Sequence, residues 1–174
     1  MKRKMLIVVD MLNDFVRPGG ALFFQQGADI IPAVKERLDA HRALGEDSYV
    51  IYVNDAHDPD DAEFDKWPPH AVKGTEGAEV VADLSPRPGE TVMLKTRYSG
   101  WYKTGMGLLV KLESPQEVEL VGVCTGICVM DTVTGFANRD IPTVIYANAV
   151  ADFDEARHEM CLKRMHEVYG TTIL

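Results

Sequence analysis

Five short, predominantly apolar runs, each followed by polar residues, most constrain how this chain can fold. They span residues 5–9, 49–53, 91–94, 118–123 and 143–146, and a shorter run at 171–174 adds a sixth. A continuous rather than alternating apolar run is typical of a strand that is buried on both faces. Segments of helical periodicity lie between the runs, at residues 30–38, 106–112, 127–136 and 156–168. In the last segment we expect Met160, Met165 and Val168 to face inward.

This alternation predicts an α/β fold with three layers, α/β/α, around a central, mostly parallel sheet of six strands. Parallel neighbours need crossover connections, and helices in those connections cover both faces of the sheet. The chain has 174 residues, 46% of them hydrophobic, which suits one core. No repeat or linker divides it, so we expect a single domain over residues 1–174.

Charge and hydropathy argue against two classes of partner. The chain carries 27 acidic and 18 basic residues, a formal net charge of -9, whereas nucleic-acid binding needs clustered Lys and Arg. No apolar run approaches the roughly 20 residues of a membrane helix. The three cysteines are an odd number in a chain too long to need disulfides. We therefore expect a cytoplasmic protein with no nucleic-acid or membrane partner.

Polar side chains follow the predicted strands at their carboxyl ends. Asp10, Asp55, Lys95 and Cys124 come after four different runs, and Cys128 lies where the fourth run turns into a helix. Ligands of open parallel sheets bind at this edge. Any one of these residues alone could be a helix cap or a turn residue, but together they predict a shared site.

Cys128 is the candidate nucleophile. It lies in residues 122–129, a strand-turn-helix junction whose glycines allow a sharp turn. A helix N-terminus lowers the pKa of a thiol, and its N–H groups can hold an oxyanion. Cys124 could pair with Cys128 in a disulfide or a metal site, but the second half of a structural zinc site is missing. We expect Cys124 to contribute its backbone.

An amide hydrolase that uses a cysteine needs a base that takes the thiol proton and returns it to the leaving nitrogen. Asp10 fits that role, and Lys95 would orient the carboxylate and favour the thiolate. Histidine is the commoner partner of a catalytic cysteine. His41, His158 and His166 lie in helical segments away from the strand ends, so we expect them on the surface.

The long irregular stretch at residues 56–77 suggests a functional loop. Asp55, His57, Glu63 and His70 form an oxygen and nitrogen set suited to one divalent zinc, iron or manganese ion. The alternative is a solvated acidic loop, which further aspartates at positions 58, 60, 61 and 65 would favour. The rigid sequence Trp67-Pro68-Pro69 before His70 favours the metal site.

These segments resemble the isochorismatase-like cysteine hydrolases, and within them the nicotinamidases, over nearly the whole chain. Residues 8–15 are similar to the first-strand motif with its catalytic Asp, and residues 55–75 to the nicotinamidase metal loop. Residues 95–99 resemble the catalytic-lysine motif, and residues 122–129 the nucleophile turn.

The resemblance implies hydrolysis of nicotinamide to nicotinate and ammonia through a cysteine thioester. It also implies a cis peptide before Cys124, so that the N–H groups of Cys124 and Cys128 face the oxyanion. Phe15 and Trp67 would sandwich the substrate ring, and Val123 would line the same site. The resemblance further makes a homo-oligomer an expectation.

Three departures from the family pattern concern the substrate. Leu12 stands where Gln is common, Gly126 stands where an acidic residue is common, and the short loop at residues 57–70 makes Glu63 the fourth candidate ligand in place of a third His. The nearest alternative is a related cysteine hydrolase acting on a carbamoyl, ureido or other small amide. An isochorismatase proper would not need Cys128, and a catalytically silent binding protein would not need Asp10, Lys95 and Cys128 together.

Overall fold

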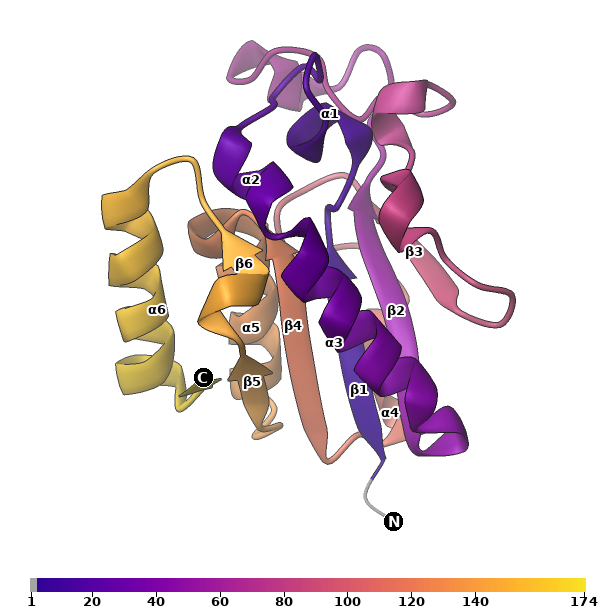
Figure 1. Ribbon diagram of the computed structural model, residues 1–174, viewed down its shortest axis with the longest axis vertical. Helices are drawn as coiled ribbons and strands as arrows, with labels where there is room; N and C mark the ends of the chain where they lie inside the picture. Colours follow the sequence, from indigo (N-terminus) through magenta and orange to yellow (C-terminus); the bar gives the residue numbers. More distant parts are fainter. Residues whose placement is uncertain (1–2) are drawn as a thin grey trace.

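A computed structural model describes residues 3–174 and has a seven-stranded sheet at its centre (Figure 1). The strand order is β3-β2-β1-β4-β5-β7, and all the pairings are parallel. The predicted α/β fold with a mostly parallel sheet is therefore confirmed. The strands are β1 (Lys4–Val9), β2 (Ser48–Asp55), β3 (Thr91–Lys95), β4 (Glu117–Val123), β5 (Thr143–Ile145), β6 (Val150–Ala151) and β7 (Thr172–Ile173).

The sheet has one strand more than the six predicted. After β5 the chain leaves β4 in a 3-10 turn at Ala147–Ala149 and returns to the same edge as β6. β5 pairs with Val118 and Glu119, whereas β6 pairs further along with Gly122 and Val123. β6 has two residues and begins only five positions after the end of β5, so it does not form a separate apolar run in the sequence.

Helices cover both faces of the sheet, which gives the three predicted layers (Figure 1). Alternate side chains of β1 enter two separate cores. Leu6 and Val8 pack on the face of α3 (Ile31–Ala43), and Met5, Ile7 and Val9 pack on the opposite face. The short α1 (Asn13–Val16) and α2 (Gln25–Asp29) lie on the α3 side. The opposite core receives side chains of α4 (Met106–Glu113), α5 (Met130–Ala137) and α6 (Glu155–Tyr169).

The predicted inward face of α6 is only partly right. Met165 is fully buried, but Met160 and Val168 are 62% and 59% exposed. The buried side of the helix follows Cys161 and Met165, which are one turn apart, and the other two residues lie outside that narrow stripe. No helix within residues 3–174 is both long enough and apolar enough to cross a membrane.

The prediction of a surface position is wrong for His41, which is 3% exposed. Its Nε2 lies 3.1 Å from the Oε2 atom of Glu119, a carboxylate buried on β4, and its Nδ1 lies 2.7 Å from Ser48. Arg37 donates two hydrogen bonds to the same carboxylate. Long-range pairing with a central strand therefore buries this histidine, away from the carboxyl edge of the sheet.

Candidate active site

The carboxyl edge of the sheet brings Asp10, Lys95 and Cys128 together. Lys95, the last residue of β3, places its Nζ 2.8 Å from Asp10 Oδ2, 2.6 Å from Asp55 Oδ1 and 3.4 Å from Cys128 Sγ. Each of these side chains is at least nine-tenths buried. Asp10, directly after β1, adopts a φ of 50°, a conformation that Asp tolerates better than most residues. The strand ends thus fix a buried cation between two carboxylates and a thiol.

Burial and mutual charge shift the pKa values of this group. Burial and the neighbouring Asp55 raise the pKa of Asp10 to about 6. Burial acts to lower the pKa of Lys95, but Asp10 and Asp55 outweigh it and raise that pKa well above its ordinary value. Burial raises the pKa of the Cys128 thiol well above its ordinary value, and Lys95 offsets only part of that rise. The lysine is therefore charged and the resting thiol is protonated.

The expected lowering of the Cys128 pKa by a helix N-terminus is therefore wrong. Cys128 is the fourth residue of a wide π-helical turn at Thr125–Val129, and α5 begins only after that turn. Desolvation is the largest cause of the raised pKa, and the two nearby carboxylates add to the rise. A protonated thiol needs a base beside it before it can act as a nucleophile.

Asp10 is oriented to be that base. Its Oδ1 accepts a hydrogen bond of 2.7 Å from the Asp55 N–H. Its Oδ2 forms the ion pair with Lys95 but accepts no hydrogen bond from the described residues. Carboxylate oxygens of Asp10 and Asp55 and the Cys128 sulfur lie within 4.8 Å of one another. The Asp10 carboxylate thus lies within reach of the thiol proton.

The turn after β4 carries the thiol on an unusual backbone. The Val123–Cys124 peptide is cis, as the resemblance implies. The Cys124 carbonyl accepts hydrogen bonds from the N–H groups of Ile127 and Val129, at 3.0 and 3.2 Å, and not from the Cys128 N–H between them. Gly122 precedes the turn with a φ of 112°, and a Cβ there would lie 2.1 Å from the Val9 carbonyl oxygen. Only glycine fits this approach of β4 to β1.

The two other cysteines do not compete for this role. All three thiols are free, so the alternative of a Cys124–Cys128 disulfide is not adopted. Burial raises the pKa of Cys124, which lines the pocket. Cys161 is buried on α6, outside the pocket lining.

Three of the four predicted metal ligands converge. Asp55, His57 and His70 offer ligand atoms that all lie within 4.8 Å of one another. Glu63 lies beside them, with its Oε1 4.0 Å from His70 Nε2. The His57 Nε2 and Glu63 Oε2 atoms are buried and have no hydrogen-bond partner among residues 3–174. Buried, unpaired donor atoms of these types fit a divalent cation.

Asp61, which the sequence analysis grouped with the solvated aspartates, lies beside the candidate metal ligand His57. Its carboxylate accepts from Arg97 and from the Glu63 N–H, and it lies 3.1 Å from His57 Nδ1. Burial acts to raise the pKa of Asp61, but these three partners lower it to about 2. The carboxylate thereby orients His57 so that its Nε2 stays free. In the sequence, the one indication of this contact was that Asp61 lies four residues after His57.

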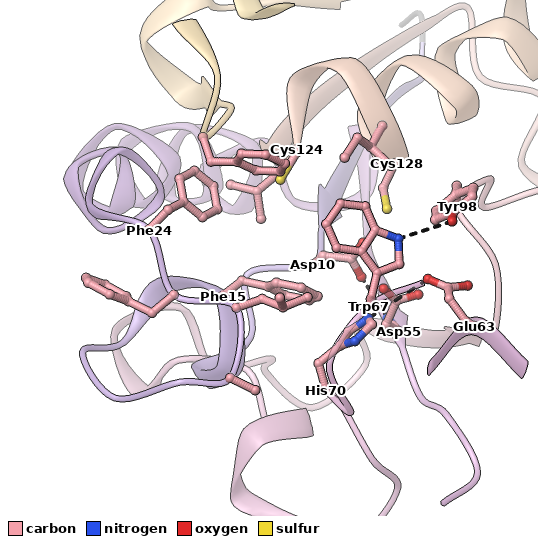
Figure 2. Close-up of a pocket in the computed structure, with 16 residues that line it drawn as sticks. Asp10, Phe15, Phe24, Asp55, Glu63, Trp67, His70, Tyr98, Cys124 and Cys128 are labelled. Carbon is pink, nitrogen blue, oxygen red and sulfur yellow. Dashed lines mark hydrogen bonds and ion pairs between the residues drawn. The ribbon is translucent and has the colours of Figure 1, made fainter. Parts of the chain in front are cut away.

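Above these groups opens a pocket of about 330 Å³ with mostly aromatic and aliphatic walls (Figure 2). Phe15 and Trp67 line it, and Trp67 Nε1 donates to the Tyr98 hydroxyl at 3.3 Å. The sequence analysis missed Tyr98, Phe24 and Phe153, because loops rather than periodic elements bring them here. The sixteen lining residues, none of them Lys or Arg, are Asp10, Phe15, Ala21, Leu22, Phe23, Phe24, Asp55, Glu63, Trp67, His70, Tyr98, Val123, Cys124, Ile127, Cys128 and Phe153.

Two sequence features lie outside this pocket. Leu12 stands where the family commonly has Gln, and it is fully buried in the core on the α3 side. This difference therefore removes a polar group from the core and not from the pocket wall. His158 and His166 also lie away from the pocket lining. His158 is half-buried, 2.9 Å from Thr125 Oγ1, and His166 is exposed. No histidine other than His70 therefore lines the pocket within residues 3–174.

Comparison with known proteins gives one family. Residues 4–174 match the isochorismatase domain. A nicotinamidase/pyrazinamidase from Bacillus subtilis is 34% identical with a TM-score of 0.92, covering 98% of each chain. An N-carbamoylsarcosine amidase from Thermoplasma acidophilum is 31% identical with a TM-score of 0.89, over 98% of this chain and 95% of that one. A pyrazinamidase from Pyrococcus horikoshii, solved in complex with zinc, is 28% identical with a TM-score of 0.89, over 99% and 98%.

Proposed function

Because the chain belongs to the isochorismatase family of hydrolases, we propose that it is a nicotinamidase-type enzyme. It would convert nicotinamide to nicotinate and ammonia through a thioester on Cys128. The observation that carries this proposal is the pocket itself, whose lining combines the Cys128 thiol with two aromatic side chains, Phe15 and Trp67, and with three of the candidate metal ligands, Asp55, Glu63 and His70 (Figure 2).

The charge of the pocket supports a neutral aromatic amide over the carbamoyl and ureido acids. Asp10, Asp55 and Glu63 line the pocket, and the lining includes no Lys or Arg that could receive a substrate carboxylate. The Lys95 ammonium is buried and already paired with two carboxylates. An anionic substrate would therefore meet like charge, whereas a flat neutral ring gains contact with the aromatic walls.

The reaction begins with proton transfer from the Cys128 thiol to Asp10 Oδ2 as the sulfur attacks the carboxamide carbon. Since the thiol pKa lies above that of Asp10, this transfer is uphill at rest and is expected to occur in concert with attack. The N–H groups of Cys124 and Cys128 donate to the oxyanion that forms. Lys95 keeps the carboxylate oriented and balances the negative charge.

Asp10 then returns the proton to the leaving nitrogen, the carbon–nitrogen bond breaks, and ammonia departs from the thioester. In the second half, Asp10 accepts a proton from water as the water oxygen attacks the thioester carbon. The carbon–sulfur bond breaks, the thiolate recovers the proton from Asp10, and nicotinic acid leaves and ionises to nicotinate. One carboxylate thus acts as base and acid in turn.

Asp55, His57 and His70, with Glu63 beside them, would hold one divalent ion of zinc, iron or manganese. When bound, the ion supplies a positive charge that polarises a ring nitrogen or orients a water molecule. We expect elemental analysis of freshly purified protein to find about one ion per chain, and His57→Ala or His70→Ala to lose it.

The exposed His166→Ala variant is the matched control and should keep the metal, since His166 lies away from the three converging ligands. Metal-free wild-type protein, or equal metal content in all three variants, would contradict this part of the proposal.

The substrate is tested by an ammonia-release screen over nicotinamide, pyrazinamide, N-carbamoyl amino acids and biuret, with and without a chelator. We expect kcat/KM of about 10⁴ M⁻¹s⁻¹ or more for the two aromatic amides and no comparable turnover of the carbamoyl acids. Faster release from a carbamoyl or ureido acid would instead place the chain with the ureido-type amidohydrolases.

A further inference from the structure

We propose that Asp152 is a positioning residue that holds the turn carrying Cys128, in partnership with Arg157. Asp152 follows β6 directly and is 3% exposed. Its Oδ2 accepts a hydrogen bond of 2.9 Å from the Gly126 N–H, within the nucleophile turn. Its Oδ1 accepts from the Arg157 guanidinium and from the Asp154 N–H at 3.2 Å. Both carboxylate oxygens are thus engaged, one by the turn and one by α6.

The contact with Gly126 fixes the direction of the whole turn. Hydrogen bonds from a backbone N–H to an ionised carboxylate are shorter and stronger than neutral ones. The turn has five residues, Thr125–Val129, so a rotation at Gly126 moves the Cys128 thiol and its N–H group together. Asp152 is not among the residues that line the pocket, and it therefore acts through the turn rather than on the substrate.

Arg157 explains why position 126 carries no side chain. A Cβ on Gly126 would lie 2.7 Å from Arg157 Cγ and 2.9 Å from both Arg157 Cδ and Cys161 Sγ. The stem of Arg157 already fills the space that a side chain would need. The acidic residue common at this position in the family is absent, and in this chain a carboxylate reaches the turn from β6 instead.

The decisive variant is Asp152→Asn. Asparagine offers one acceptor oxygen and one NH₂ group. Because Gly126 and Arg157 are both donors, one of them must then face the NH₂ group and lose its hydrogen bond. We expect kcat for nicotinamide to fall roughly 10- to 100-fold with little change in KM. The group that is displaced, the Cys128 thiol, takes part in the reaction and not in substrate binding. The rate of Cys128 alkylation by iodoacetamide, resolved by mass spectrometry of the modified peptide, should fall with it.

Asp154→Asn is the matched control, with the same change of charge two residues away. Asp154 caps α6 by accepting the Arg157 N–H at 3.0 Å and does not hydrogen-bond to the turn. Because Asn caps a helix about as well as Asp, this variant should leave the fold, kcat and Cys128 alkylation nearly unchanged. Equal losses in both variants, or none in Asp152→Asn, would overturn the proposal.

A second variant keeps the test open if Asp152→Asn does not fold. In Gly126→Ala the added Cβ meets the Arg157 stem and pushes the turn away from Asp152, so the same fall in alkylation is expected. If Cys128 in Gly126→Ala were alkylated at the wild-type rate, the proposal would be overturned. The kinetic comparison rests on the proposed function, whereas the alkylation comparison does not. If the wild-type protein did not hydrolyse nicotinamide, that result would contradict only the proposed function.

Discussion

Ammonia release from nicotinamide is expected to disappear when Cys128 is replaced by alanine, with kcat falling about 10⁴- to 10⁶-fold. The thiol lies beside both Asp10 and Lys95, and an alanine offers no atom to form the thioester. Loss of one buried sulfur should change the free energy of unfolding by only about 1 kcal/mol. Steady-state ammonia assays and thermal unfolding together separate loss of chemistry from loss of fold.

Cys161→Ala is the matched control, because that thiol is also buried but lies outside the pocket lining. It should keep nearly full activity. If the protein without Cys128 released ammonia at the parent rate, the proposed mechanism would be wrong.

Replacing Lys95 by methionine is expected to abolish activity and to destabilise the fold by about 3–5 kcal/mol. Methionine is close to lysine in length but carries no charge, so the buried carboxylates of Asp10 and Asp55 lose the cation between them. Their mutual repulsion must then be relieved by protonation. Denaturant unfolding of chelator-treated proteins measures the loss.

The stability deficit of Lys95→Met should depend on pH. Asp10 already has a pKa raised to about 6, and removal of the neighbouring cation raises it further. A carboxyl whose folded-state pKa is raised stabilises the fold when protonated, and that contribution is lost as the pH rises through the folded-state pKa. The deficit should therefore be large at pH 8 and smaller at pH 5.

A double variant, Lys95→Met with Asp10→Asn, removes one of the two unpaired charges and serves as the control. It should recover part of the stability at pH 8 without recovering activity. Equal unfolding free energies of Lys95→Met and the wild type at pH 8 would show that the buried cation does not hold these carboxylates in place.

Much of the fold could be predicted because parallel strands that are covered on both faces leave predominantly apolar runs in the sequence. The central strands β1, β2 and β4 are of this kind. The two-residue β6 and the burial of His41 could not be predicted in this way. Both depend on pairing with β4, which lies far away in the sequence, and local periodicity carries no record of such contacts.

The candidate site divides in the same way. Asp10, Lys95 and Cys128 were brought together by one topological rule, since each follows a strand of the same parallel sheet. Asp61 and Asp152 act from loops, where only the folded chain shows which carboxylate faces inward. The raised pKa of Cys128 also depends on burial that no motif displays. The oligomeric state and the cellular compartment stay predictions.

The central claim, a thioester on Cys128 during hydrolysis of nicotinamide, is tested most directly by rapid mixing, acid quenching and mass spectrometry of metal-loaded wild-type protein. The account predicts a nicotinoyl group on Cys128 that forms as ammonia is released, decays as nicotinate appears, and is absent in Cys128→Ala. Full turnover of nicotinamide with the acyl group on Cys124, or with Cys128 unmodified throughout, would contradict it.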